Sequence, residues 1–129
     1  LHGSSAASDV YKRQNYIFGL NVIEISSNIR SGANIYISEF FAATGLLLVI
    51  LLSRADGKNV VSFNVGIYIT AALIFTSSTS FANPAVTIAR MFTESFTGIN
   101  PSTVIFFISC QVIGMFAAYI LYNQFFKSK

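Results

Sequence analysis

Charged residues, cysteine and histidine are scarce in this sequence. Only 10% of its 129 residues are charged, against about 25% in ordinary soluble domains, whereas 53% are hydrophobic. The one cysteine, Cys110, excludes an internal disulfide, and one histidine, His2, cannot complete a His/Cys metal set, so we expect neither metal nor cofactor. The net charge of +3 is scattered, which argues against a nucleic-acid partner. The composition favours a protein whose solvent is the lipid bilayer.

The first fourteen residues do not match the rest of the chain. Residues 1–14 (LHGSSAASDVYKRQ) are polar and lack the apolar core of a signal peptide. Their sequence resembles translated sequencing-adapter read-through. We therefore expect a non-native prefix outside the fold and the loss of the true upstream sequence. Residues 15–34 are interpreted as the end of a preceding span followed by a polar extracellular loop.

Three apolar stretches predict membrane spans at about residues 35–53, 60–78 and 102–126. A helix needs about 20 apolar residues to cross the hydrocarbon core. The helices of a soluble bundle would show a polar face, whereas segments such as TGLLLVILL show none. The predicted fold class is therefore an all-α membrane protein.

The distribution of basic residues predicts the orientation. They gather in the link between the first two spans and in the C-terminal tail: Arg54, Lys58, Lys127 and Lys129. Cytoplasmic segments carry the excess of Lys and Arg, so we expect the 53–59 loop and the C-terminus to be cytoplasmic. Residues 76–101, between the second and third spans, then start and finish on the outer side.

The stretch SFANPAVTIAR predicts a broken helix between the second and third spans. Asn83 is a favoured N-cap and Pro84 a favoured first helical residue, so we expect a short helix over about residues 83–95. Non-helical backbone is tolerated at membrane depth only where it is buried in protein or lines a wet cavity. A re-entrant half-helix fits this requirement. The alternative is a plain outer loop with an amphipathic surface helix.

Two features of the apolar stretches require an explanation. Glu39 is the only charge in the first span, and a carboxylate at depth costs about 2.5–3.5 kcal/mol even on insertion scales. It either has a structural role or reaches the outer interface. Gly114 and Ala118, four residues apart beside Ala117, predict a close-packing face on the third span, because small residues let membrane helices approach. The alternative is that Gly114 is merely tolerated.

The NPAVTIAR segment contains the Asn-Pro-Ala signature of the aquaporin (major intrinsic protein) family. The flanking segments SGANIYISEF, SEFFAATGLLLVILL and PSTVIFFISCQVIGMFAAYIL resemble the outer loop, fourth span and sixth span of that family. The resemblance implies that residues 35–129 are the second half of an inverted-repeat bundle, with three transmembrane helices and one re-entrant half-helix. It also implies two further partners, the missing N-terminal half and the other subunits of a homotetramer.

The resemblance also implies roles for individual residues. Asn83, Pro84 and Ala85 would lie at the pore, where Asn83 donates its amide to passing solute. Glu39 would accept hydrogen bonds from the re-entrant loop. The carbonyls of residues 80–82 would line the outer half of the path.

The residue after the signature departs from the commonest family pattern. Water-selective and glycerol-type members have arginine there, whereas this sequence has Val86, like a bacterial branch linked to arsenite movement. By family spacing, Ser80 and Ala71 complete the predicted selectivity filter, with an uncertainty of a residue or two in the position of Ala71. Arg90 lies one helical turn beyond Val86. It is predicted to lie at the vestibule, or alternatively to form a salt bridge with Glu94.

These observations predict a passive channel for water and small neutral solutes, such as glycerol-like polyols or arsenite, in a bacterial inner membrane. Proton exclusion would rest mainly on the half-helix dipole. Two alternatives remain besides an enzyme, which the lack of histidine beyond the prefix disfavours. A secondary transporter would also contain broken helices, although only Glu39 could serve as a coupling charge. A non-conducting fragment is the other.

Overall fold

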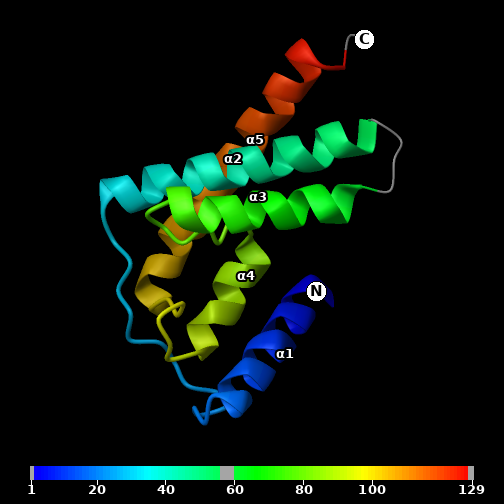
Figure 1. The fold of residues 1–129 in the computed structure, drawn as a ribbon. Coiled ribbons are helices and arrows are strands. Elements are labelled where there is room, and N and C mark those ends of the chain that lie inside the picture. Colours follow the sequence, from blue (N-terminus) through cyan, green and yellow to red (C-terminus); the bar gives the residue numbers. More distant parts are fainter. Residues whose placement is uncertain (1, 56–59, 128–129) are drawn as a thin grey trace.

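The computed structural model describes residues 2–55 and 60–127, and every element in them is helical. The elements are α1 (His2–Ile17), α2 (Ala33–Ala55), α3 (Val61–Phe75), α4 (Pro84–Ala89) with a 3₁₀ turn (Arg90–Phe92), and α5 (Pro101–Phe125). In Figure 1, α2 and α3 lie side by side, α5 crosses behind α2, and α4 lies below them next to α1. Helices α2 and α5 share the largest interface.

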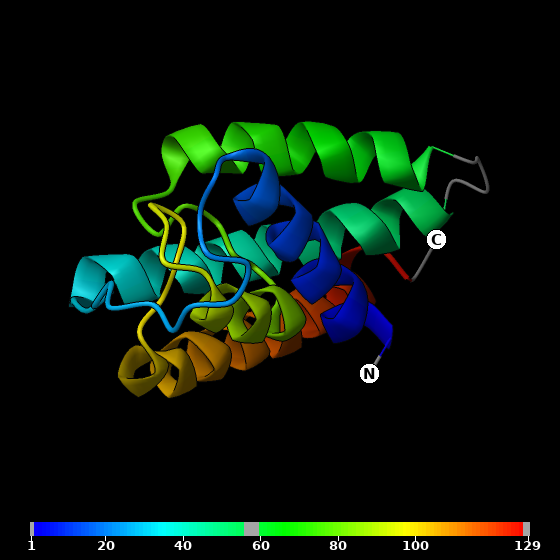
Figure 2. The same cartoon turned by 90° about the horizontal axis from the view of Figure 1, so that it is seen from below.

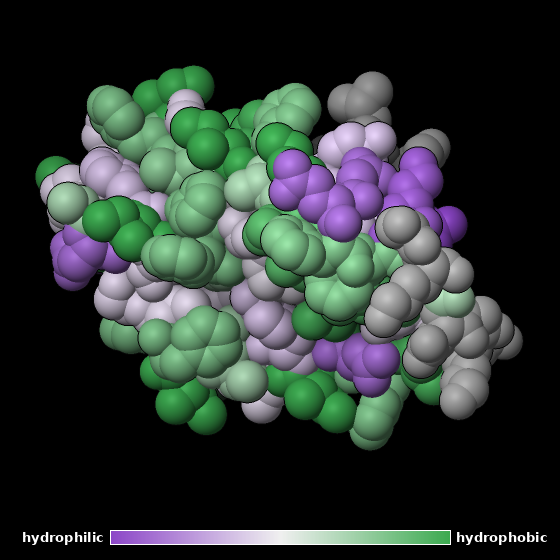
Figure 3. All heavy atoms as spheres, turned by 90° about the horizontal axis from the view of Figure 1, so that it is seen from above, coloured by the Kyte–Doolittle hydropathy of each residue, from purple (hydrophilic) through white to green (hydrophobic). Residues whose placement is uncertain are grey.

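Helices α2 and α5 are long and apolar enough to cross a membrane. They contain 23 and 25 residues, with mean hydropathies of 2.2 and 2.3, and both exceed the length of about 20 residues that a span needs. Their ends lie within two residues of the predicted ones. Figure 3 shows hydrophobic side chains across much of the face seen from above. Such exposed apolar surface is what lipid or further helices would cover.

Helix α3 is shorter than the span predicted at 60–78. It has 15 residues and ends at Phe75, so at 1.5 Å per residue it covers only about 22 Å of a core about 30 Å thick. It ends there because Thr76 has extended backbone and its Oγ1 donates a hydrogen bond to the Ala72 carbonyl at 2.6 Å. The predicted extension of the helix to residue 78 was therefore wrong.

The placement of residues 1–14 outside the fold is also corrected. They form most of α1, which lies alongside α4 (Figure 2). The helix is held at its C-terminal end by Asn15, which is 3% exposed. Asn15 Oδ1 accepts a hydrogen bond from Thr93 Oγ1 at 2.9 Å, and its Nδ2 donates to the Asn21 carbonyl. The expected adapter origin of residues 1–14 is a separate matter and stays a prediction.

The interface between α2 and α5 is closest at Gly114. A Cβ added there would lie 2.5 Å from the Phe40 carbonyl oxygen and 3.0 Å from Thr44 Oγ1. Thr44 Oγ1 donates hydrogen bonds to the carbonyls of Phe40 and Gly114 across this contact. Ala118, one turn further along α5, is fully buried. The small residues therefore lie where the two helix backbones approach each other.

Replacing Gly114 with leucine is expected to destabilise the α2–α5 interface by about 1–3 kcal/mol, the usual cost of overpacking. The added side chain has no free space because the nearest atom is backbone. Gly66 is a matched control, since a Cβ there meets nothing within 4 Å. Unfolding in detergent micelles, followed by circular dichroism, measures both variants. Equal stabilities for Gly114→Leu and Gly66→Leu would contradict the packing argument.

Candidate functional site

The helix break is organised by Asn83. Its backbone is extended, and its side-chain Oδ1 accepts a hydrogen bond from the Ala85 N–H at 2.9 Å, which makes it the N-cap of α4. Pro84 occupies the first turn, where its missing N–H costs nothing. The helix continues only to Ala89, followed by one 3₁₀ turn, because Thr93 is extended and hydrogen-bonded to Asn15. The half-helix is thus shorter than the predicted 83–95.

The backbone before Asn83 is held in an unusual conformation. Thr79, Ser80 and Ala82 have positive φ angles of 60°, 46° and 51°. Such angles cost about 1–3 kcal/mol for residues with a Cβ, and they persist only where the surroundings impose them. Glu39 supplies part of that constraint, because its carboxylate accepts hydrogen bonds from the backbone N–H groups of Phe81 and Ala82.

Glu39 is fully buried, so it does not reach the outer interface as the alternative expectation had it. Its Oε1 also accepts a hydrogen bond from Gln111 Nε2 at 2.8 Å. The same Nε2 donates to Thr87 Oγ1 at 2.7 Å, and both Gln111 and Thr87 are fully buried. The network therefore joins α2, α4 and α5 at one point. A buried carboxylate with three donors is consistent with a structural role.

The sequence analysis did not single out Gln111, Thr87 or Arg30. Gln111 is the only amide in the central part of the third apolar stretch. A lone buried polar residue in a membrane helix calls for a partner, and this was the available signal. Arg30 lies in a polar loop, where one more charge attracts no attention. Its contacts come only from the fold.

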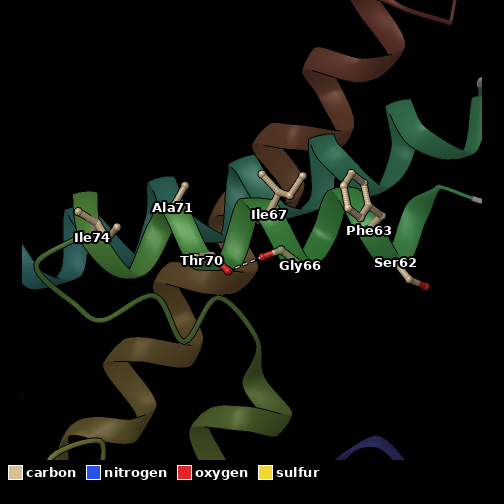
Figure 4. A pocket seen from close by; sticks show the side chains of 7 residues that line it. All are labelled: Ser62, Phe63, Gly66, Ile67, Thr70, Ala71 and Ile74. Carbon is tan, nitrogen blue, oxygen red and sulfur yellow. Dashed lines mark hydrogen bonds between the residues drawn. The ribbon is translucent and has the colours of Figure 1, made fainter.

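The predicted filter residues are not brought together by this chain. Val86 is half-buried and packs against the core cluster of Phe81, Ile99, Val104 and Phe107. Ser80 is 5% exposed. Ala71 is exposed, and Figure 4 shows it on the side of α3 that points away from α4, in an open groove with Ile67 and Ile74. A constriction formed by Val86, Ser80 and Ala71 stays a prediction about a larger assembly.

A smaller hollow lies beside Asn83. It has a volume of about 140 Å³ and is lined by one amide and six apolar side chains: Asn83, Ala43, Leu46, Leu47, Ile50, Ala82 and Met115. The Asn83 side chain is exposed. Within residues 2–55 and 60–127, its Nδ2 has no hydrogen-bond partner. The arrangement offers a free amide donor on an otherwise apolar surface.

The expected alternative of a salt bridge between Arg90 and Glu94 is wrong. Glu94 accepts hydrogen bonds from the backbone N–H and the hydroxyl of Ser27 in the preceding loop. Arg90 Nε instead donates to Tyr11 Oη at 2.8 Å. The side-chain hydroxyl and then the backbone N–H of Ser27 lower the pKa of Glu94 below its ordinary value. Glu94 thus joins the two outer loops.

The contact between Glu94 and Ser27 is expected to persist at neutral pH and to be lost under strong acid. Because the pKa of Glu94 is lowered in the folded state, its stabilisation is present above the ordinary pKa of glutamate, about 4.3. It disappears as the pH falls through the lower folded value. Carbon-13 NMR of the Glu94 carboxyl measures the midpoint. Ser27→Ala should raise this midpoint, and an unchanged midpoint would contradict the assignment.

The geometry defines a class of protein before any comparison. Two membrane-length apolar helices enclose a broken helix, whose start is fixed by Asn-Pro and whose preceding loop is held by a buried glutamate. Among the described residues, no group of three His, Cys, Asp or Glu side chains could hold a metal ion. This is the arrangement of half of an aquaporin-like membrane bundle.

A comparison with known proteins supports this class. Over 105 residues, the chain is 42% identical to the aquaglyceroporin AqpS of Rhizobium meliloti (strain 1021). The match covers 81% of the chain but 45% of the relative, so the chain spans about half the length of that protein. No family model and no solved structure matches the chain. The chain belongs to the aquaporin (major intrinsic protein) family and is an integral membrane protein.

Proposed function

We propose that this chain forms the second half of a passive channel for water and small uncharged solutes. The observation that carries the proposal is the exposed Asn83 amide beside an otherwise apolar hollow. An uncharged solute with hydroxyl groups can exchange a hydrogen bond with water for one with Asn83, while its carbon atoms contact Leu46, Ile50 and Met115. An ion would lose its hydration without replacement.

The solute class follows from Val86. An apolar side chain after the Asn-Pro-Ala motif leaves a wider and less polar opening than arginine would. We therefore propose that the solutes include glycerol-like polyols and metalloid acids such as arsenous acid. The similarity to a protein named an aquaglyceroporin supports the polyol part of this proposal.

We further propose the surroundings in which the channel works. Asn83 and the filter residues need partners from an N-terminal half, and the complete channel would be a homotetramer in a bacterial inner membrane. The exposed Arg54 and Lys127 support a cytoplasmic position for the 53–59 loop and the C-terminus. Lys58 and Lys129, which the same prediction used, lie outside the described residues.

A chimeric channel tests the function. Residues 15–129 are joined to the first half of the Rhizobium aquaglyceroporin and reconstituted in lipid vesicles. Swelling in glycerol and uptake of arsenous acid should be fast, non-saturating and independent of ion gradients. The unjoined chain should leak no faster than empty vesicles, because half a pore encloses no path. Saturable or gradient-dependent uptake by the chimera would favour a transporter instead.

A further inference from the structure

Two guanidinium groups share one aromatic ring at the outer end of the broken helix. The Cζ atom of Arg90 lies 4.1 Å from the ring centroid of Phe81, and that of Arg30 lies 5.1 Å from it. Phe81 is 3% exposed and its ring also contacts Phe107, with centroids 5.2 Å apart. The ring faces attract cations, so Phe81 offsets part of the repulsion between the two arginines.

Arg30 is held in place without losing its charge. Its Nε donates to the Gly98 carbonyl at 2.8 Å, and its Nη2 donates to the Phe96 carbonyl at 2.6 Å. Its Nη1 makes a longer contact of 3.4 Å with Thr79 Oγ1, next to the left-handed backbone. All three acceptors are neutral. The contacts fix the guanidinium but leave its positive charge uncompensated.

Arg90 is similarly uncompensated. Its one acceptor is the neutral Tyr11 hydroxyl, and its Nη1 is buried with no partner among the described residues. In the part of the chain that the structure describes, the only ion pair joins Asp9 and Lys12. Glu39 is the buried acid nearby, and its charge is already bound by backbone N–H groups. Burial first, and the neighbouring Arg90 second, lower the pKa of Arg30, but arginine stays protonated in proteins.

We propose that Arg30 and Arg90 together form a cationic outer mouth, which opposes the passage of cations in the channel proposed above. The inference rests on that function and assigns the charge barrier to residues outside the predicted filter. Val86 supplies no charge, and α4 has only six residues, so its dipole is a weaker barrier than the half-helix predicted from sequence. Width and charge are then set by different side chains, and neutral solutes pass a mouth that repels cations.

The test uses the chimeric channel described above, with K⁺ and proton flux measured against glycerol flux in the same vesicles. Arg90→Gln and Arg30→Gln should each raise the ratio of cation flux to glycerol flux by about tenfold, as expected for one unit charge acting over several ångströms at an effective dielectric constant of about 20. Arg90→Lys should keep the ratio low, because it keeps the charge. The matched control is Arg54→Gln, an exposed arginine at the end of α2, which should leave both fluxes unchanged.

The outcomes separate this inference from the proposed function. If the unaltered chimera conducts glycerol and both Gln variants keep its cation-to-glycerol ratio, the cationic mouth is overturned while the channel stands. If Arg90→Lys leaks cations as Arg90→Gln does, shape rather than charge is responsible, and the inference is overturned. Failure of the unaltered chimera to conduct any neutral solute would overturn both.

Discussion

Replacing Glu39 with alanine is expected to release the segment before Asn83 and to abolish solute flux. The change leaves three donors without an acceptor: the backbone N–H groups of Phe81 and Ala82, and Gln111 Nε2. Each buried group without a partner costs about 1–3 kcal/mol, and the left-handed backbone at Ser80 and Ala82 loses its constraint. We expect a total loss of at least about 3 kcal/mol, because the three costs outweigh the relief of burying no carboxylate.

Two measurements and two control variants test this prediction. Unfolding in detergent micelles gives the stability, and amide hydrogen exchange at Phe81 and Ala82 reports on the local release. Glu39→Gln retains one acceptor oxygen and should be intermediate. Glu24→Ala removes an exposed acid whose recorded side-chain partner is Asn21, and it should behave as the parent. A stable Glu39→Ala variant with slow exchange at both amides would contradict the structural role.

Asn83→Ala should be milder in stability than Glu39→Ala. It removes one cap hydrogen bond, to the Ala85 N–H, and the loss of an N-cap costs about 1 kcal/mol. Its effect on flux should be larger than its effect on stability, because the same change removes the amide donor beside the apolar hollow. The two variants therefore separate the residue that holds the loop from the residue that meets the solute.

The parts of the site that were predictable from sequence are the local ones. Asn83 and Pro84 act on the residues next to them, so their cap could be read from four letters of sequence. Glu39 was noticed because a charge in an apolar run needs an explanation. The partners of Glu39 could not be read in the same way, because Gln111 meets it only when α5 packs against α2.

The misassigned parts depend on competition between nearby groups. The hydrophobicity of residues 60–78 indicates a longer helix, but the Thr76 hydroxyl bonds back to Ala72 and the chain turns. Spacing alone pairs Arg90 with Glu94, yet Ser27 offers Glu94 two donors from a loop more than sixty residues away. Arg30 reaches Phe81 through a third loop contact. Sequence spacing carries no information about such contacts.

Replacing Val86 with arginine should cut the flux of glycerol and arsenous acid far more than that of water. Val86 is the third residue of α4 and packs against the apolar cluster around Phe81 and Phe107. A guanidinium cannot be buried in that cluster without partners, so the longer side chain must extend into the path. It would narrow the opening and add a charge there. Water, being smaller, should pass with the least loss.

The size of the effect and its control follow from the same geometry. A loss of about 3 kcal/mol in the transfer of a larger solute corresponds to a reduction of roughly a hundredfold in its flux. Val86→Leu adds bulk without charge and stays compatible with the neighbouring Ile99 and Val104, so its effect should be several-fold smaller. Stopped-flow swelling of vesicles containing the chimeric channel measures water and glycerol, and arsenous acid uptake is measured in parallel. An unaltered channel that carries water alone would contradict the wide opening, because Val86 would then not set the size of the solute.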